Sequence, residues 1–267
     1  MIIIIALFAI LITYLYFHNK SSETKLQQTI TNLQTEIRKL KDNTNSSFDV
    51  IPLDGIFEVH ITVKHNDNYV KLLEFIKRYE KEKGMKLIYA VSSKANNQYM
   101  ISYFTRKDDD KLAVDSANKI AKEMIKEEIE ISRIKVESHN TKNTPQTDEN
   151  YFQFHKYLEE KYGKSCGKPY FEFHVKVNAH KTKQSYFKDL EHECTKFNGV
   201  AVSYNICGQN KKPLITIRLY DKGFLNAQHY KDHVIDTLKT IGYTFEDRIQ
   251  QEFSIYDTNA EQDYGWL

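Results

Sequence analysis

Hydrophobic and polar residues alternate along two short stretches of the chain, and the two stretches resemble each other. The first runs from Phe57 to Val63 (FEVHITV) and the second from Phe171 to Val177 (FEFHVKV). Strict alternation predicts half-buried β-strands, whose apolar side chains face a core while the polar ones face the opposite way. Each stretch carries a histidine at its centre, so the rest of the chain is interpreted around these two predicted strands.

The same order of elements follows each of these strands. The first half predicts strands at 57–63, 87–91, 99–106 and 131–137 and helices at 69–83 and 110–128; the second predicts strands at 170–177, 200–206, 214–219 and 245–255 and helices at 181–197 and 226–241. This βαββαβ order is the ferredoxin-like pattern. Nearly constant offsets separate the pairs His60/His174, Val91/Val202, Arg133/Arg248 and Glu137/Glu252. The predicted fold class is therefore α+β, a tandem duplication of a ferredoxin-like unit of roughly 85 residues.

An apolar segment precedes the predicted repeats. Residues 2–17 contain no charged residue, which predicts a single transmembrane helix; a cleaved signal peptide is the alternative. Lys20 and Lys25 follow the segment, so the positive-inside rule predicts a single-pass membrane protein with a cytoplasmic head. Leu26, Ile30, Leu33, Ile37 and Leu40 then form a heptad seam. The seam predicts a parallel homodimer through residues 26–40, with a single stalk helix as the alternative.

These features divide the chain into six predicted parts. They are a transmembrane anchor (1–19), a coiled-coil stalk (20–45), a linker (46–55), the first repeat (56–138), a linker with a bridging helix (139–169), and the second repeat with a C-terminal tail (170–267).

Composition adds little to this organisation. Lys and Arg number 38 and Asp and Glu 36, and a net charge of +2 gives no strong nucleic-acid signal. The three cysteines have no metal-type spacing, which fits a reducing compartment. The codon preference implied by the abundant Lys, Asn and Ile is typical of an AT-rich genome, such as that of a large DNA virus or a protist.

Polar residues on the predicted strands form the candidate site. Parity along each strand places them on the sheet face opposite the helices. The ligand-binding candidates are Glu58, Arg106, Arg133, Glu172, Lys176, Ser203, Asn205, Arg218, Arg248 and Glu252. A solvated face with cross-strand ion pairs is one interpretation. The other is a shared cleft in which arginine forks bind an anionic ligand or an unidentified protein, without catalysis.

A partial motif supports a second hypothesis. His60-Ile61-Thr62-Val63 resembles the His-x-Thr/Ser-x motif of the 2H phosphoesterases, whose duplicated repeats each contribute a histidine. In the second repeat Lys176 stands where the phosphate-binding hydroxyl would be. The resemblance implies an enzyme acting on a cyclic phosphate or an RNA end, with His60 and His174 as the acid–base pair and Thr62 as a phosphate contact.

The C-terminal half resembles a family of uncharacterised, mainly bacterial proteins. These proteins begin with a YFEFHVK strand and end in a YDSN…D.GW tail; here the strand starts at Tyr170, and the tail runs from Tyr256 to Trp266 with Thr258 for Ser. The resemblance implies a shared fold and brings no activity. Asp257, Asn259 and Asp263 in the tail do not match a calcium loop. No metal site and no cofactor are predicted.

Overall fold

The computed structural model describes residues 50–64, 69–91, 97–180, 187–205 and 212–263. Within them the fold is mixed α+β, with five α-helices and an antiparallel sheet. The elements are β1 (Gly55–Val63), α3 (Tyr69–Lys83), β2 (Lys86–Val91), β3 (Gln98–Lys107), α4 (Asp110–Lys126), β4 (Ile131–Ser138), α5 (Asp148–Tyr162), the 3₁₀ turn η1 (Lys164–Cys166), β5 (Tyr170–His180), α6 (Phe187–Cys194), β6 (Val200–Asn205), β7 (Leu214–Leu219), α7 (Phe224–Thr240), β8 (Tyr243–Phe245), β9 (Gln250–Asp257) and η2 (Ala260–Asp263).

The predicted anchor and stalk, residues 1–45, lie outside the described residues. No helix in the part of the chain that the structure describes is long and apolar enough to cross a bilayer.

Side chains at the helix starts explain where two of the helices begin. The Asp109 carboxylate accepts a hydrogen bond from the Lys111 amide at the start of α4. The Thr147 hydroxyl accepts one from the Asn150 amide at the start of α5. Such N-caps satisfy amides that have no partner inside the helix and contribute about 1 kcal/mol each.

One predicted strand is divided in the structure. The alternation across 245–255 predicts a continuous strand, but β8 ends at Phe245 and β9 begins at Gln250. The two strands pair with different parts of β5: Phe245 lies opposite Val177 and Phe253 opposite Phe171. The exposed residues Asp247 and Arg248 occupy the break.

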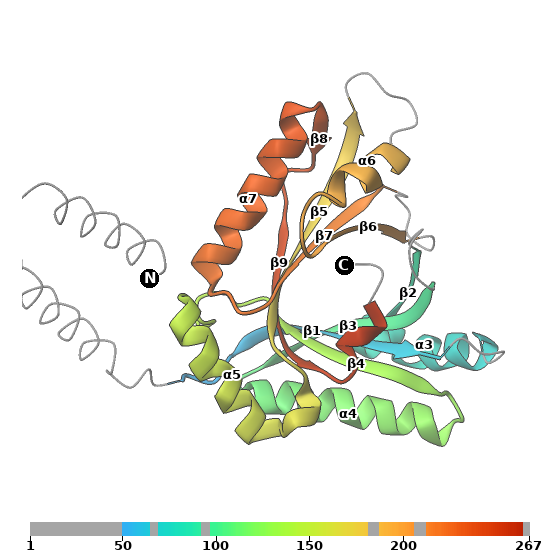
Figure 1. Ribbon diagram of the computed structural model, residues 1–267. Helices are drawn as coiled ribbons and strands as arrows, with labels where there is room; N and C mark the ends of the chain where they lie inside the picture. Colours follow the sequence, from blue (N-terminus) through green and yellow to red (C-terminus); the bar gives the residue numbers. More distant parts are fainter. Residues whose placement is uncertain (1–49, 65–68, 92–96, 181–186, 206–211, 264–267) are drawn as a thin grey trace, which may run out of the picture. The chain divides into compact units, whose positions relative to one another are not determined.

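The two halves of the chain have the same strand order. It is β2-β3-β1-β4 in the first half and β6-β7-β5-β9 in the second, with every neighbouring pair antiparallel (Figure 1). Two further pairings join the halves, because β4 pairs with β9 and β2 pairs with β6. The eight strands therefore form a closed ring of pairings, while β8 extends from one end of β5.

The two faces of this closed sheet differ in chemistry. On the outer face, Phe57, Val59 and Ile61 of β1 are fully buried, and α4 packs on β1, β3 and β4. Helices α6 and α7 pack on the second half in the same way. Burying each of these large apolar side chains contributes roughly 1.5–3 kcal/mol. The inner face is polar, and its side chains come from both halves.

Candidate functional site

Most of the residues predicted from strand parity lie on the inner face of the closed sheet. Those that are buried or half-buried there are Glu58, His60, Thr62, Arg133, Glu172, His174, Ser203, Arg218 and Glu252. Three other predicted residues, Arg106, Lys176 and Arg248, are exposed. Asn205 ends β6, where its backbone lies opposite Ala90 of β2. The interior therefore holds the two histidines and two of the four predicted arginines.

The first half contributes a glutamate–histidine–glutamate set from β1 and β4, here called the first set. His60 Nε2 lies 3.2 Å from Glu137 Oε2 and 3.5 Å from Glu58 Oε1. The Ser102 hydroxyl of β3 donates a hydrogen bond of 2.6 Å to Glu58. His60 Nδ1 is buried without a hydrogen bond.

The second half repeats this arrangement with residues of β5 and β9, here called the second set. His174 Nε2 lies 3.2 Å from both Glu172 Oε1 and Glu252 Oε2. Its Nδ1 lies 3.1 Å from the hydroxyl of Thr216, which occupies the register position that Ser102 has in the first half. Each half thus places one imidazole between two carboxylates.

Two side chains at equivalent positions of β4 and β9 connect the sets. Lys135 Nζ lies 2.7 Å from Glu137 and 3.1 Å from Glu172; we call this contact the lysine bridge. Gln250 Nε2 donates to Glu252 and, at 3.1 Å, to Glu58; we call this the glutamine bridge. Each bridge reaches from its own half to the first glutamate of the other half.

A third imidazole lies at the glutamine bridge. His139 follows β4, and its Nε2 lies 3.3 Å from Glu252 Oε1 and 3.4 Å from Glu58 Oε2. Its backbone amide donates to Ile56, so the ladder between β4 and β1 continues through it.

Two arginines and the end of the chain complete the polar interior. Arg133 donates to Asp257 and, through Nη1, to Asp263 Oδ2 at 2.8 Å. Arg218 donates to Glu172 at 2.7 Å and, through Nη2, to the same Asp263 oxygen at 2.6 Å. The ring of Tyr170 lies 4.3 Å from the Arg218 guanidinium. Both guanidinium groups therefore converge on one carboxylate oxygen from η2.

The described part of the interior holds more carboxylates than permanent cations. Among the described residues, six carboxylates (Glu58, Glu137, Glu172, Glu252, Asp257 and Asp263) lie near three permanent cations (Arg133, Lys135 and Arg218), and three imidazoles (His60, His139 and His174) lie beside the carboxylates. Unpaired charges are costly in such an environment, so each ionic state depends on its neighbours.

The pKa values follow these neighbouring charges. Burial opposes the charged form of His174, but Glu252 and Glu172 outweigh it and raise its pKa to about 10. Burial likewise opposes the charge on His139, whose pKa Glu58 and Glu252 raise. For Glu172, burial is outweighed by Arg218 and Lys135, which hold its pKa well below the usual range. The pKa of Asp263 falls to about 2, because Arg133 and Arg218 outweigh its burial.

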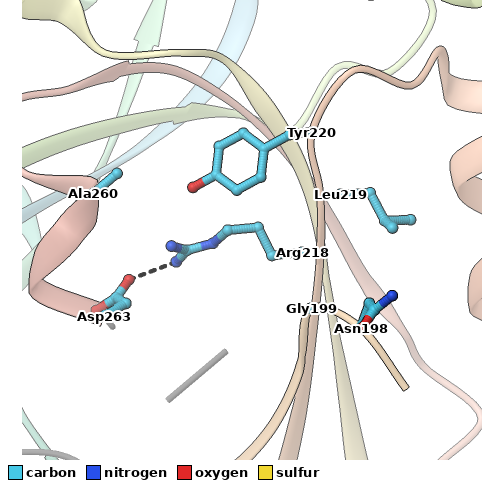
Figure 2. Close-up of a pocket in the computed structure, with 7 residues that line it drawn as sticks. All are labelled: Asn198, Gly199, Arg218, Leu219, Tyr220, Ala260 and Asp263. Atoms are coloured by element: carbon cyan, nitrogen blue, oxygen red, sulfur yellow. Dashed lines mark hydrogen bonds and ion pairs between the residues drawn. The ribbon is translucent and has the colours of Figure 1, made fainter. Parts of the chain in front are cut away.

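A pocket opens beside Arg218 and Asp263. It has a volume of about 320 Å³ and is lined by Asn198, Gly199, Arg218, Leu219, Tyr220, Ala260 and Asp263. Figure 2 shows the Arg218 side chain extending to Asp263, with the Tyr220 ring beside it. Gly199 has a φ of +70°, and a Cβ there would lie 2.2 Å from the Arg218 carbonyl oxygen. The pocket wall therefore requires glycine at this position.

The surroundings of the two predicted catalytic histidines bear on the phosphoesterase hypothesis. Nε2 of His60 and Nε2 of His174 each lie between two carboxylate oxygens. A phosphate anion next to either nitrogen would meet these negative charges at close range. The hypothesis stays a prediction, and the arrangement around the histidines favours protons or a cation over an anion.

Several interior residues are not among the ligand-binding candidates. Strand parity places Lys135, Glu137 and Gln250 on the same polar face as those candidates, whereas His139 lies in a segment predicted to be a linker. The alternation through positions 133, 135 and 137 continues to 139, and this continuation is the sequence signal that identifies His139 as an inner-face residue.

Comparisons with known proteins give weak likenesses only. No family model and no curated protein matches the sequence. A chlorite dismutase from Candidatus Nitrospira defluvii, in complex with imidazole, is 8% identical, covers 75% of this chain and 91% of its own, and has a TM-score of 0.27. The siroheme decarboxylase NirDL, in complex with an iron-uroporphyrin III analogue, is 11% identical, covers 85% and 82%, and has a TM-score of 0.25. Likenesses of this size do not assign a function.

Proposed function

We propose that the protein is a non-catalytic binding protein whose ligand is a small molecule with an anionic group. The observation that carries this proposal is the convergence of Arg133 and Arg218 on one oxygen of Asp263, beside a pocket of about 320 Å³. That volume is at the lower end of the range typical of small-molecule sites.

The chemistry of the pocket wall agrees with such a ligand. Guanidinium groups bind carboxylates and phosphates through several N–H donors in a fixed fork. Arg133 and Arg218 keep other carboxylate partners, Asp257 and Glu172, if Asp263 is replaced. An incoming anion can therefore take the place of the Asp263 carboxylate without leaving either arginine unpaired. Tyr220 and Leu219 supply an aromatic and an aliphatic wall.

The proposal also covers the internal duplication of residues 56–267 and the attachment of the protein to a membrane. We propose that the two halves are copies of one ferredoxin-like unit, supported by the shared strand order and by the two glutamate–histidine–glutamate sets at equivalent positions. We also keep the proposal of a membrane anchor in residues 1–19 and of a parallel dimer through residues 26–40, which rests on the sequence alone.

The test compares anion binding by the purified full-length protein and by Asp263→Asn. Phosphate, sulfate, succinate and citrate serve as probes in calorimetry and thermal unfolding. Removing the competing carboxylate should strengthen the binding of at least one probe by about tenfold or more. Asp236→Asn, on the exposed face of α7, is the matched control and should leave the affinity unchanged.

A second variant tests the pocket without touching the ion pairs. Ala260 lines the pocket, so Ala260→Leu should fill it and weaken binding of the larger probes. The proposal is wrong if no probe binds either the natural protein or Asp263→Asn, or if binding is the same in Ala260→Leu.

A further inference from the structure

The lysine bridge and the glutamine bridge occupy equivalent positions but differ by one positive charge. Lys135 places an ammonium group between Glu137 and Glu172. Gln250 places a neutral amide between Glu252 and Glu58. Among the described residues, no lysine or arginine forms an ion pair with Glu58 or Glu252, and Lys86 acts on Glu58 only from farther away. The glutamine bridge therefore lacks the fixed cation that its counterpart has.

The atoms at the glutamine bridge have the spacing of metal ligands. His139 Nε2 lies 3.3 Å from Glu252 Oε1 and 3.4 Å from Glu58 Oε2, and one atom from each of these residues lies within 4.8 Å of the others. Ligands about 2.1 Å from a common ion are separated by about 3.0 Å in octahedral and about 3.4 Å in tetrahedral geometry. Charge-assisted hydrogen bonds between nitrogen and oxygen are shorter, about 2.7–2.9 Å.

The hydrogen bonding of the atoms at the glutamine bridge also favours a bound metal ion. His139 Nε2 is buried and makes no hydrogen bond, although two carboxylate oxygens are close to it. The Glu252 side chain beside it is fully buried, and its Oε1 accepts only from the Gln250 amide among the described hydrogen bonds. Buried polar atoms normally have partners, so unpartnered ones indicate a missing ion or water.

We propose that Glu58, His139 and Glu252 bind one divalent transition-metal ion, which supplies the positive charge that the ammonium of Lys135 supplies at the lysine bridge. Gln250 would be the fourth ligand, because its amide can turn over and present oxygen instead of nitrogen. Two carboxylates with one imidazole suit first-row ions such as Zn²⁺ and Mn²⁺ better than Ca²⁺, which prefers an all-oxygen set.

One ion is expected rather than two. Glu172, His174 and Glu252 form a second group with compatible spacing, and it shares Glu252 with the first. Glu172 already holds the charges of Arg218 and Lys135, so a second divalent ion there would meet two fixed cations. The site at the glutamine bridge has no such repulsion. This inference does not depend on the anion pocket.

The test uses two opposite substitutions at one residue. Full-length protein is stripped with a chelator and titrated with Zn²⁺ by calorimetry, and Mn²⁺ binding is followed by loss of the free-ion EPR signal. The natural protein should bind one ion per chain. Gln250→Lys should weaken binding by roughly tenfold or more, because it installs a competing ammonium, while Gln250→Glu should strengthen it by adding a charged oxygen ligand.

Two further variants separate this site from other histidines. His139→Asn should also lose binding, whereas His155→Asn, which alters an imidazole on α5 near Glu159, should retain it. Near-UV circular dichroism checks that each variant is folded. The proposal is overturned if neither ion binds the natural protein, or if the affinity is the same in Gln250→Lys, Gln250→Glu and His139→Asn.

Discussion

In the second half of the chain, Glu172 is held by two permanent cations, Arg218 and Lys135. In the first half, its counterpart Glu58 is held by two imidazoles, His60 and His139, which carry a charge only when protonated. The backbone positions correspond, and the geometry of the glutamate–histidine–glutamate sets is nearly the same. The two halves therefore differ mainly in whether the neutralising charge is built into the chain.

With the proposed metal site, this difference would separate a structural role from a binding role within one closed sheet. Permanent cations satisfy buried carboxylates in every state of the protein, so the lysine bridge needs nothing from solution. Among the described residues the glutamine bridge has no permanent cation, and the proposed metal ion would supply that charge. Substitutions that exchange or remove these partners test the comparison directly.

The largest effect is expected at the lysine bridge. Lys135→Met removes the ammonium and leaves Glu137 and Glu172 as buried carboxylates with one partner fewer. The free energy of unfolding should fall by about 3–5 kcal/mol in urea titrations at pH 7. Gln250→Met removes a neutral amide at the equivalent position and should cost only about 1 kcal/mol.

A surface lysine provides the control for this pair. Lys111 forms an exposed ion pair with Asp115, so Lys111→Met should change the free energy of unfolding by less than about 0.5 kcal/mol. If Lys135→Met were no more destabilising than Gln250→Met, the two bridges would be energetically alike and the comparison would fail.

A smaller effect is expected when acid protonates Asp263. Its carboxylate is paired with two permanent cations, Arg133 and Arg218. The pKa of Asp263 is lowered to about 2, against an ordinary value of 3.8. Its stabilisation is fully present above about pH 4 and is lost as the pH falls toward 2, a loss on the order of 2 kcal/mol. Urea titrations between pH 5 and 2 should show a shallower decline for Asp263→Asn than for the natural protein. An identical decline would mean that Asp263 is not ionised in the folded protein.

Hydroxyl groups give the next test, because Ser102 and Thr216 occupy equivalent positions and bond to different partners. Ser102 donates to the carboxylate of Glu58, whereas Thr216 contacts the imidazole of His174. Both partners are charged at neutral pH, but the Ser102 bond is 2.6 Å long and the Thr216 contact 3.1 Å. Ser102→Ala should therefore cost about 1.5 kcal/mol and Thr216→Val about 1 kcal/mol. The reverse order in urea titrations would show that Thr216 supports the more strongly charged set.

The sequence predicted the elements well because their signals are local. The apolar spacing of 69–83 predicts α3 with the bounds that the structure gives it, and the alternation at 57–63 predicts nearly all of β1. The division of 245–255 was not predictable in this way. It depends on β5 being long enough to pair with β8 at one end and β9 at the other, which is a property of distant residues.

The site was predicted in part, for the same physical reason. Parity identifies which side chains leave the apolar face, and it selected Glu58, Glu172 and Glu252. It leaves open whether the two polar faces are solvated or form one shared surface, because closure depends on the pairings β4–β9 and β2–β6. The contact of His139 with Glu252 and the convergence of Arg133 and Arg218 both depend on this closure. No local pattern in the sequence predicts them.

The smallest effects are expected at the predicted site residues that the structure leaves outside the interior. Arg106 and Arg248 are exposed, and Lys176 forms only a loose ion pair of 3.7 Å with Glu246. Single substitutions of these residues by alanine should change the free energy of unfolding by less than about 0.5 kcal/mol. They should also leave phosphate and citrate binding unchanged, because none of them lines the pocket beside Arg218. A marked loss of anion binding in Arg106→Ala or Arg248→Ala would instead move the anion site from the interior to the outer surface.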